Sequence, residues 1–388
     1  MKKALYLLCL LALVVTAVAA PATMASAAKA PIKVGVLAGI TGGGAAWGVF
    51  HRDAAILAAE EINAKGGIMG RPVELVIYDT KGRAEDAVNA TRRLLLQDKV
   101  VAIAGTNMSG LQIAIRPVSE QYKVPIYSIS ATNPAVTVDP VTKKPYPYSF
   151  RICFTDPYQG SVMAAFLANK KNLKTAVIFH DVGSDYAEGI KQYFTETFTK
   201  EGGKIAGTYG YREGDVDFRA QITQAKATGA QAVCLPGMYK EMALIIKQCE
   251  ELGWKPVFIG GDGYSPAMGE IAGKAMEGTF WVTHMAFDDP VLIPLLKKFE
   301  ARFKKQATEP VSITLAYDTA HAIFNAIKRA KSTDGTAIAK AMETEKGLKL
   351  IDFTLTMDPK THDPLNKPAA ILRIVNGKEI LDTKVAPK

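Results

Sequence analysis

Residues 32–67 read IKVGVLAGITGGGAAWGVFHRDAAILAAEEINAKGG. The apolar run at 32–38 predicts a strand, Thr41-Gly42-Gly43-Gly44 predicts a turn, and residues 47–64 have helical character. Gly66-Gly67 ends that helix, because glycine readily adopts the left-handed conformation at a helix C-terminus. The stretch therefore predicts one strand–turn–helix unit, which is the repeating unit of a parallel sheet.

Similar units continue on both sides of a proline-rich loop at 140–147. Strands are predicted at 73–78, 100–105, 125–129, 175–179, 231–235 and 256–259, and helices at 84–97, 111–122, 186–200, 218–228 and 241–252. This alternation indicates right-handed βαβ crossovers and parallel sheets. Successive helices follow at 291–305, 314–331 and 336–345, and then a hairpin at 371–382 that turns at Asn376-Gly377.

The two halves of the chain resemble each other weakly. Lys33-Val34-Gly35-Val36 and Lys174-Thr175-Ala176-Val177 each open a unit, and Ala64-Lys65-Gly66-Gly67 and Lys200-Glu201-Gly202-Gly203 close them. These matches favour an α/β fold with two doubly wound parallel-sheet lobes over one large sheet. The helices that follow the second set of units indicate that the chain crosses back between the lobes.

The first residues have the layout of a secretory signal peptide. Met1-Lys2-Lys3 is basic, residues 4–20 are apolar except for Thr16, and Ala25-Ser26-Ala27 resembles a cleavage site. A membrane anchor is less favoured, because the apolar run is shorter than the roughly 20 residues of a spanning helix. We therefore expect residues 1–27, with Cys9, to be removed on export.

The charge distribution and the sequence motifs argue against several classes of function. The chain has 47 Lys+Arg against 38 Asp+Glu, a net charge of +9, but its lysines are dispersed, so no nucleic-acid partner is expected. No nucleotide-binding glycine motif, nucleophile elbow or H-E-x-x-H motif is found, and the five histidines are scattered. The sequence therefore predicts no enzyme activity, no metal site and no cofactor; an exported hydrolase would need a nucleophile that the sequence does not reveal.

Three cysteines remain after removal of the leader: Cys153, Cys234 and Cys249. None has metal-ligand spacing, and an odd number leaves at least one thiol unpaired. Cys234 follows apolar Ala232-Val233 and is expected to be buried as a small hydrophobic residue. Whether Cys234 and Cys249 form a disulfide stays open.

Polar loops follow several of the predicted strands. Thr41–Gly44, Thr106–Gly110 and Ser128–Pro134 combine small residues with hydroxyl groups, and free N–H groups at a helix start favour a carboxylate or phosphate. Gly260-Gly261-Asp262-Gly263 follows a strand of the second half and offers an acid to an ammonium group. Helix capping and turn formation are the alternatives. Together the loops suit a zwitterion such as an amino acid.

Several stretches match a known family: Ile32–Val36, Ala59–Ile68, Tyr78-Asp79, His180-Asp181, Tyr186–Gly189, Asp217-Phe218 and Gly260–Gly263. The I-N-A-K-G-G-I helix end within Ala59–Ile68 is quite specific. Through them the chain resembles the periplasmic solute-binding proteins of branched-chain amino acid ABC transporters, the leucine/isoleucine/valine-binding type. The resemblance implies two Rossmann-like lobes that are joined by three hinge crossings and close on a ligand. By analogy, lobe 1 comprises 28–150 plus 280–354, and lobe 2 comprises 151–279 plus 355–388.

The resemblance also implies ligand-binding residues. The ligand carboxylate is expected at Ser109, Ser130 and Thr132, and the ammonium at Asp262, one methylene shorter than the family's usual glutamate. Trp47 stands where an aromatic residue often covers the side-chain pocket, and Tyr186 matches a tyrosine on the opposing lobe. Where the family often has an aromatic contact, this chain reads Pro236-Gly237-Met238-Tyr239, and the sequence leaves open whether Met238 or Tyr239 faces the ligand.

The resemblance implies an exported, periplasmic, monomeric receptor that closes on an amino acid-like solute, with a branched-chain amino acid favoured. Its partner is an ABC permease in the inner membrane, and the contact residues are not identified. Two alternatives remain: a module that senses a ligand for a chemoreceptor or sensor kinase, and a receptor for a different carboxylate or an amide.

Overall fold

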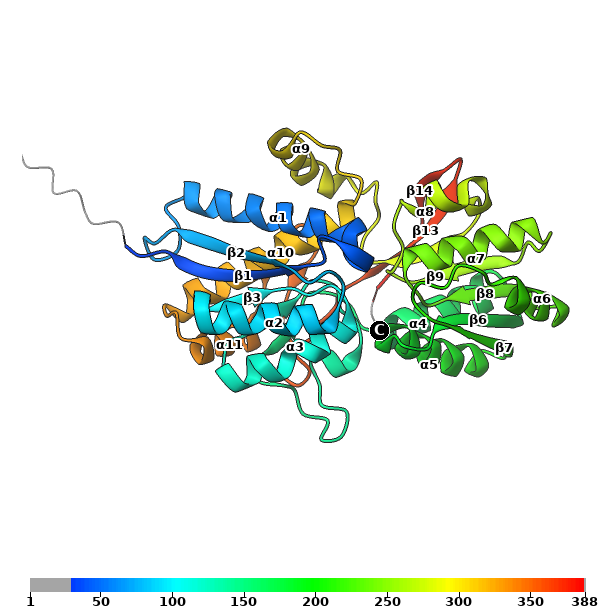
Figure 1. Cartoon of the computed structure of the whole chain (residues 1–388), viewed down its shortest axis with the longest axis horizontal. Coiled ribbons are helices and arrows are strands. Elements are labelled where there is room, and N and C mark those ends of the chain that lie inside the picture. The colour runs from blue at the N-terminus through cyan, green and yellow to red at the C-terminus, as the bar shows by residue number, and fades with distance from the viewer. Residues whose placement is uncertain (1–28, 387–388) are drawn as a thin grey trace, which may run out of the picture.

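The computed structural model describes residues 29–386, which form two α/β lobes lying side by side (Figure 1). The predicted signal peptide at 1–27, with Cys9, lies outside the described residues. Within residues 29–386, no helix combines the length and the apolar character needed to cross a membrane. The α/β fold with two parallel-sheet lobes is confirmed.

The first lobe contains a parallel five-stranded sheet in the order β2-β1-β3-β4-β5. Its strands are β1 (Ile32–Ala38), β2 (Val73–Asp79), β3 (Ala102–Ala104), β4 (Ile126–Ser128) and β5 (Ser149–Arg151). Its helices are α1 (Ala45–Ala64), α2 (Ala84–Arg93), α3 (Ser109–Tyr122), α9 (Ile293–Phe303), α10 (Pro310–Ala330) and α11 (Gly335–Glu343), with a small hairpin of β11 (Leu348–Lys349) and β12 (Thr354–Leu355). Helices α1 and α10 pack on one face of the sheet, and α2 and α3 pack on the other.

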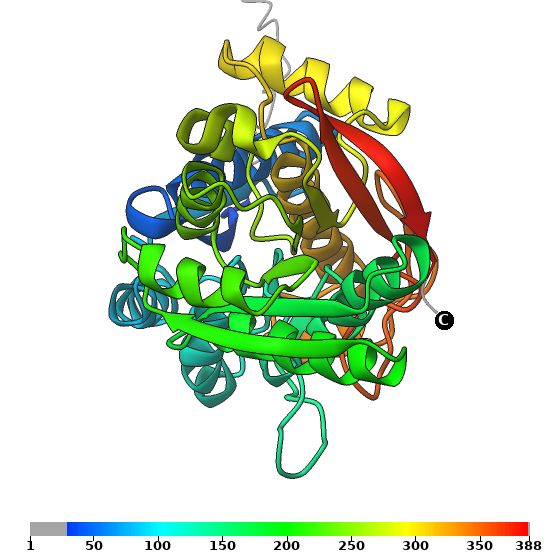
Figure 2. The ribbon, with the colours of Figure 1, turned by 90° about the vertical axis from the view of Figure 1, so that its right-hand side faces the viewer.

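The second lobe contains a seven-stranded sheet in the order β14-β13-β10-β9-β8-β6-β7. Its strands are β6 (Thr175–Asp181), β7 (Lys204–Tyr211), β8 (Ala232–Leu235), β9 (Val257–Gly260), β10 (Phe280–Thr283), β13 (Ala369–Val375) and β14 (Lys378–Val385). Its helices are α4 (Asp156–Ala165), α5 (Asp185–Lys200), α6 (Arg219–Ala227), α7 (Tyr239–Glu251) and α8 (Met268–Ala272). Figure 2 looks onto this lobe, with the antiparallel β13–β14 hairpin in red along one side.

Short helical turns extend or connect these elements. They are η1 (Gly42–Gly44), η2 (Leu94–Asp98), η3 (Pro134–Val136), η4 (Phe166–Lys170), η5 (Gly273–Met276) and η6 (Pro290–Leu292). The turn η2 continues α2 in π-helical geometry and packs against Gly35 of β1. A Cβ atom at Gly35 would lie 2.8 Å from Leu94 Cδ1, so glycine permits this close approach to the central strand.

The burial of each strand agrees with the pattern of apolar residues in its sequence. β1 lies between two neighbours and has helices on both faces, so its apolar run is buried almost throughout. β14 lies at an edge and alternates between exposed and half-buried residues. The predicted hairpin turn is confirmed, with positive φ angles of 51° at Asn376 and 70° at Gly377, as a tight hairpin turn requires.

Two crossings between the lobes fall later in the chain than predicted. Residues 280–283 pair with β9 and β13, so β10 belongs to the second sheet rather than to the first lobe. Near the third crossing, Leu355 and Met357 pack into the core of the first lobe, and the His362 ring stacks on Phe150 at 4.3 Å. The predicted boundary at 355 therefore lies too early, because apolar packing keeps the chain on the first lobe through His362.

Packing also decides whether Cys234 and Cys249 form a disulfide. Cys153, Cys234 and Cys249 are all buried as free thiols. Cys234 faces the core beneath α4 and α5, whereas Cys249 on α7 packs into the core on the opposite face of the sheet. The two sulfur atoms therefore lie on different sides of the second sheet, and the bridge that the sequence left open is not formed.

Candidate ligand-binding site

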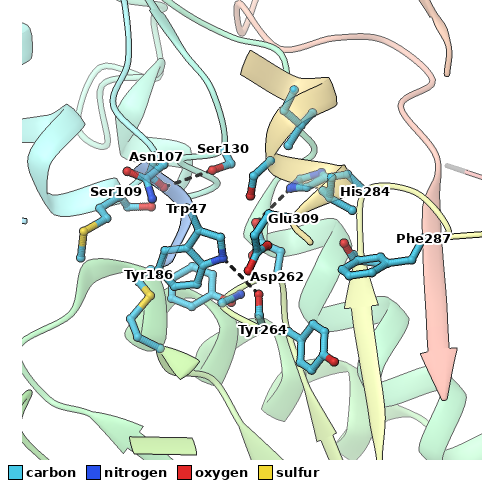
Figure 3. Close-up of a pocket in the computed structure, with 17 residues that line it drawn as sticks. Trp47, Asn107, Ser109, Ser130, Tyr186, Asp262, Tyr264, His284, Phe287 and Glu309 are labelled. Carbon is cyan, nitrogen blue, oxygen red and sulfur yellow. Dashed lines mark hydrogen bonds and ion pairs between the residues drawn. The ribbon is translucent and has the colours of Figure 1, made fainter. Parts of the chain in front are cut away.

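A cleft lies between the lobes, where the carboxyl ends of the strands of both sheets face each other (Figure 3). This is the place where open α/β sheets bind ligands. The space measures about 570 Å³, part of it open to solvent. Its lining comes from both lobes: Trp47, Asn107, Met108, Ser109, Ser130, Tyr186, Met238, Asp262, Gly263, Tyr264, Thr283, His284, Phe287, Glu309, Val311, Ser312 and Leu315.

One end of the cleft offers hydroxyl and amide groups. Ser109 is the first residue of α3, and the residue before the helix, Met108, makes no side-chain cap. Ser130 follows β4, and its hydroxyl donates to the Asn107 carbonyl at 3.4 Å. The N–H groups and the positive dipole end of α3 therefore face a site with two hydroxyls, an arrangement that suits a carboxylate.

Thr132 does not reach the surface of the cleft. It is fully buried, its hydroxyl lies beside the Asp156 carboxyl, and its carbonyl accepts the Asp156 N–H at 2.9 Å. Burial raises the pKa of Asp156 well above its usual value, which favours the neutral acid. The structure thus places Thr132 behind the lining, where it contacts the start of α4.

Asp262 follows β9 in the second lobe and is held from two sides. Its Oδ1 accepts from Gln159 Nε2 at 2.9 Å, and its Oδ2 lies 3.0 Å from His284 Nε2. Burial lowers the pKa of His284, so its ring is neutral and donates from Nε2. Each carboxylate oxygen keeps a further lone pair, so Asp262 can also accept an ammonium group from the cleft.

The structure distinguishes between the two candidates next to β8. Met238 lines the cleft. Tyr239 is buried behind it and packs edge-on against Trp47, with the ring centroids 5.2 Å apart and an interplanar angle of 83°. Tyr186 lines the cleft from α5, and its hydroxyl accepts the Gly263 N–H at 3.0 Å. Tyr239 therefore supports Trp47 rather than facing the cleft.

Side-chain hydrogen bonds join the lobes around the cleft. Trp47 Nε1 donates to the Tyr264 carbonyl at 3.3 Å, and Asn133 Nδ2 donates to the Asp185 carbonyl at 2.7 Å. A third bond runs from the Ser265 hydroxyl to Glu309. The structure is therefore a closed arrangement of the two lobes.

Comparison with known proteins places this geometry in a family. A family model described as periplasmic binding protein matches residues 31–379. The chain belongs to the periplasmic binding protein family. This periplasmic binding protein is 31% identical to the leucine-, isoleucine-, valine-, threonine- and alanine-binding protein of Pseudomonas aeruginosa, over 85% of this chain and 90% of that protein. It is 30% identical to a Leu/Ile/Val-binding protein homologue of Brucella abortus, over 98% of both chains.

Solved structures of relatives share the fold. The leucine-binding protein LivK of Thermotoga maritima has a TM-score of 0.84 and 31% identity, over 92% of this chain and 99% of that one. LivJ of Streptococcus pneumoniae, solved with isoleucine, has a TM-score of 0.83 and 28% identity, over 92% and 99% of the two chains. The resemblance inferred from the sequence is thus confirmed, including the link to branched-chain amino acid binding proteins of ABC transporters.

Of the predicted site residues of this periplasmic binding protein, the structure brings six to the cleft and leaves two, Thr132 and Tyr239, behind its lining. The six are Trp47, Ser109, Ser130, Tyr186, Met238 and Asp262. Contact of these residues with a ligand stays a prediction. Sequence reasoning missed His284, Tyr264 and Glu309. The acid that directly precedes Pro310 at a helix start was the available signal, but nothing local to Glu309 indicates that it faces the other lobe.

We expect Glu309 to make stability depend on pH. Burial, with nearby Glu379, raises the pKa of its carboxyl from 4.5 to about 8. The folded protein then holds an extra proton between these values, so the free energy of unfolding falls as pH rises, by up to about 1.4 kcal/mol per pH unit.

Glu309→Gln removes this dependence. Urea unfolding of both proteins between about pH 5 and pH 8 should show the wild type losing stability relative to the variant as pH rises. Parallel profiles of the two proteins would contradict the assignment.

Proposed function

We propose that this periplasmic binding protein captures an α-amino acid in the periplasm and delivers it to the permease of an ABC transporter. The observation that carries the proposal is the pairing of groups across the cleft. Ser109 and Ser130, with the start of α3, face the cleft from the first lobe, and Asp262 faces it from the second. A carboxylate and an ammonium on one small solute would engage both lobes together.

The closing mechanism follows from that division. The solute makes its full set of contacts only when both lobes surround it, so its binding energy favours the closed state. The bonds Trp47–Tyr264 and Asn133–Asp185 also join the two lobes in this arrangement. A permease that recognises surfaces of both lobes would then distinguish the loaded receptor. We expect the solute to be released unchanged, and we expect the receptor to act as a monomer.

A panel of amino acids tests the proposal by thermal unfolding of the mature chain. A solute at 100 times its Kd should raise the free energy of unfolding by about 2.7 kcal/mol and so raise Tm. Native mass spectrometry of the protein as purified should show the same solute, if retained, with an unchanged mass. If no amino acid raises Tm, the proposed solute class is wrong.

A further inference from the structure

Glu309 is an acid that the amino acid head group does not require. It precedes α10 of the first lobe and makes no cap for its own helix. It is 4% exposed and accepts a hydrogen bond from the Ser265 hydroxyl of the second lobe. Figure 3 shows it across the cleft from Ser109 and Ser130, on the side of His284.

Glu309 and Asp262 belong to different hydrogen-bonded groups. Asp262 is bonded to Gln159 and His284, whereas Glu309 is bonded to Ser265 and lies beside the Ser312 hydroxyl. If Asp262 accepts the ammonium of the head group, Glu309 is available for a group farther along the solute.

No cation compensates Glu309 within the cleft. Among the described residues that line it there is no lysine or arginine. The nearby charged side chain that acts on Glu309 is another acid, Glu379, and together with burial it raises the pKa of Glu309 to about 8. Below about pH 8 the buried carboxyl is therefore neutral, and an aliphatic solute would leave it so. A cation beside it would restore the carboxylate and gain a charge-assisted hydrogen bond.

A second hollow adjoins the cleft at Ser109, and we call it the acidic mouth. Four acids line it: Asp181, Asp185, Glu213 and Glu241. Asp185 and Glu241 lie in the first turns of α5 and α7, where helix dipoles favour an acid. Glu213 lacks that support, and burial with Glu241 and Asp181 nearby raises its pKa. None of the four forms an ion pair within residues 29–386.

The negative charge of this lining is opposite in sign to the net charge of the whole chain, which is +9. Lys240, exposed at the start of α7, lies close enough to act on Glu213, but the described lining of the hollow contains no lysine or arginine. A cleft of one sign with walls of low dielectric concentrates solutes of the opposite sign and speeds their association.

We propose that the solute is a cationic amino acid, whose distal ammonium, amidinium or guanidinium group is held by Glu309. The inference rests on the proposed function, because it assumes that Ser109, Ser130 and Asp262 hold the amino acid head. It adds the chemistry of the side chain: a second positive charge completes the bonds that Glu309 offers, and the acidic mouth attracts it.

Three amino acids that differ only at the end of the side chain test the inference. Norleucine ends in a methyl group, 5-hydroxynorvaline in a hydroxyl and ornithine in an ammonium group, on the same three-carbon spacer; lysine and 2,4-diaminobutyrate vary the spacer. Isothermal titration of the mature chain should show the best diamino acid binding about 10- to 100-fold more tightly than norleucine.

The Glu309→Gln variant should abolish that preference, because its amide oxygen can still accept from Ser265 but carries no charge. Circular dichroism verifies that the variant is folded. Glu277→Gln, an exposed acid of the second lobe outside the cleft, is the matched control and should behave as the wild type. Glu213→Gln should slow the association of ornithine and reduce its dependence on salt, because the acidic mouth acts over distance.

Each outcome separates the two proposals. If norleucine or leucine binds as tightly as every diamino acid, this inference is wrong and the proposed function stands. If 5-hydroxynorvaline matches the diamino acids, a neutral donor is sufficient and the cationic assignment is wrong. If no amino acid binds, the proposed function fails, and this inference fails with it.

Discussion

Replacing Arg151 with methionine is expected to lower the free energy of unfolding by about 3–5 kcal/mol. Arg151 is fully buried at the end of β5, and its Nε lies 2.5 Å from Asp363 Oδ1. Its two terminal nitrogens donate to the Ala131 and Asn133 carbonyls, each at 2.9 Å, and one also reaches the Thr137 hydroxyl. Methionine fills the space but leaves an acid and several carbonyls without their partner.

The same variant is expected to weaken solute binding. Arg151 bonds to residues 131–137, the loop that directly follows Ser130, and to Asp363 near the third crossing. Loss of these bonds frees the loop and adds an ordering cost to each binding event. Urea unfolding monitored by tryptophan fluorescence, and isothermal titration with the best solute, measure the two effects.

Two control variants test whether the loss comes from the buried position and pairing of Arg151. Arg219→Met removes an arginine that is 54% exposed and pairs with surface acids, so it should change stability by less than about 1 kcal/mol. The double variant Arg151→Met/Asp363→Leu should lose less than the sum of its single variants, because each single change strands the partner. A loss below about 1 kcal/mol for Arg151→Met would show that the buried guanidinium is not stabilising.

Asp262→Asn is expected to raise the Kd of the best amino acid by about 30- to 4,000-fold, which corresponds to about 2–5 kcal/mol. The amide keeps the size of the side chain but removes the negative charge that faces the solute ammonium. The neutral His284 ring can exchange tautomers to pair with the amide, so the unliganded protein should stay folded.

Isothermal titration of Asp262→Asn against the wild type measures the effect, and circular dichroism verifies the fold. Glu277→Gln provides the same carboxylate-to-amide change at an exposed position of the second lobe, and it should leave the Kd unchanged. If Asp262→Asn binds every amino acid within about twofold of the wild type, Asp262 does not receive the ammonium group.

The predicted elements agree well with the structure where local interactions decide them. The first strand was predicted at 32–38 and is found at Ile32–Ala38, and the hairpin turns at Asn376-Gly377 as expected. The long helix predicted at 84–97 appears as α2 and the π-turn η2 together. Apolar periodicity and turn residues act over a few neighbours, so they can be recognised along the chain.

The site was only partly predictable. Trp47, Ser109 and Asp262 were assigned through the resemblance, and the structure brings all three to one cleft. Thr132 and Tyr239 show the limit, because a rotation at a strand end decides whether a side chain lines the cleft or lies behind it. That rotation depends on packing against elements distant in sequence, such as α1 behind Tyr239.

The sequence by itself determined the strand–turn–helix unit at 32–67, its repetition along the chain and the division into two lobes. Only the tertiary structure decided that β10 belongs to the second sheet, that Cys234 and Cys249 lie on opposite faces, and that Glu309 faces Ser265 across the cleft. The physical reason is the range of the forces involved. Backbone preferences and apolar periodicity act between near neighbours, whereas packing, burial and charge depend on which distant segments meet when the lobes close.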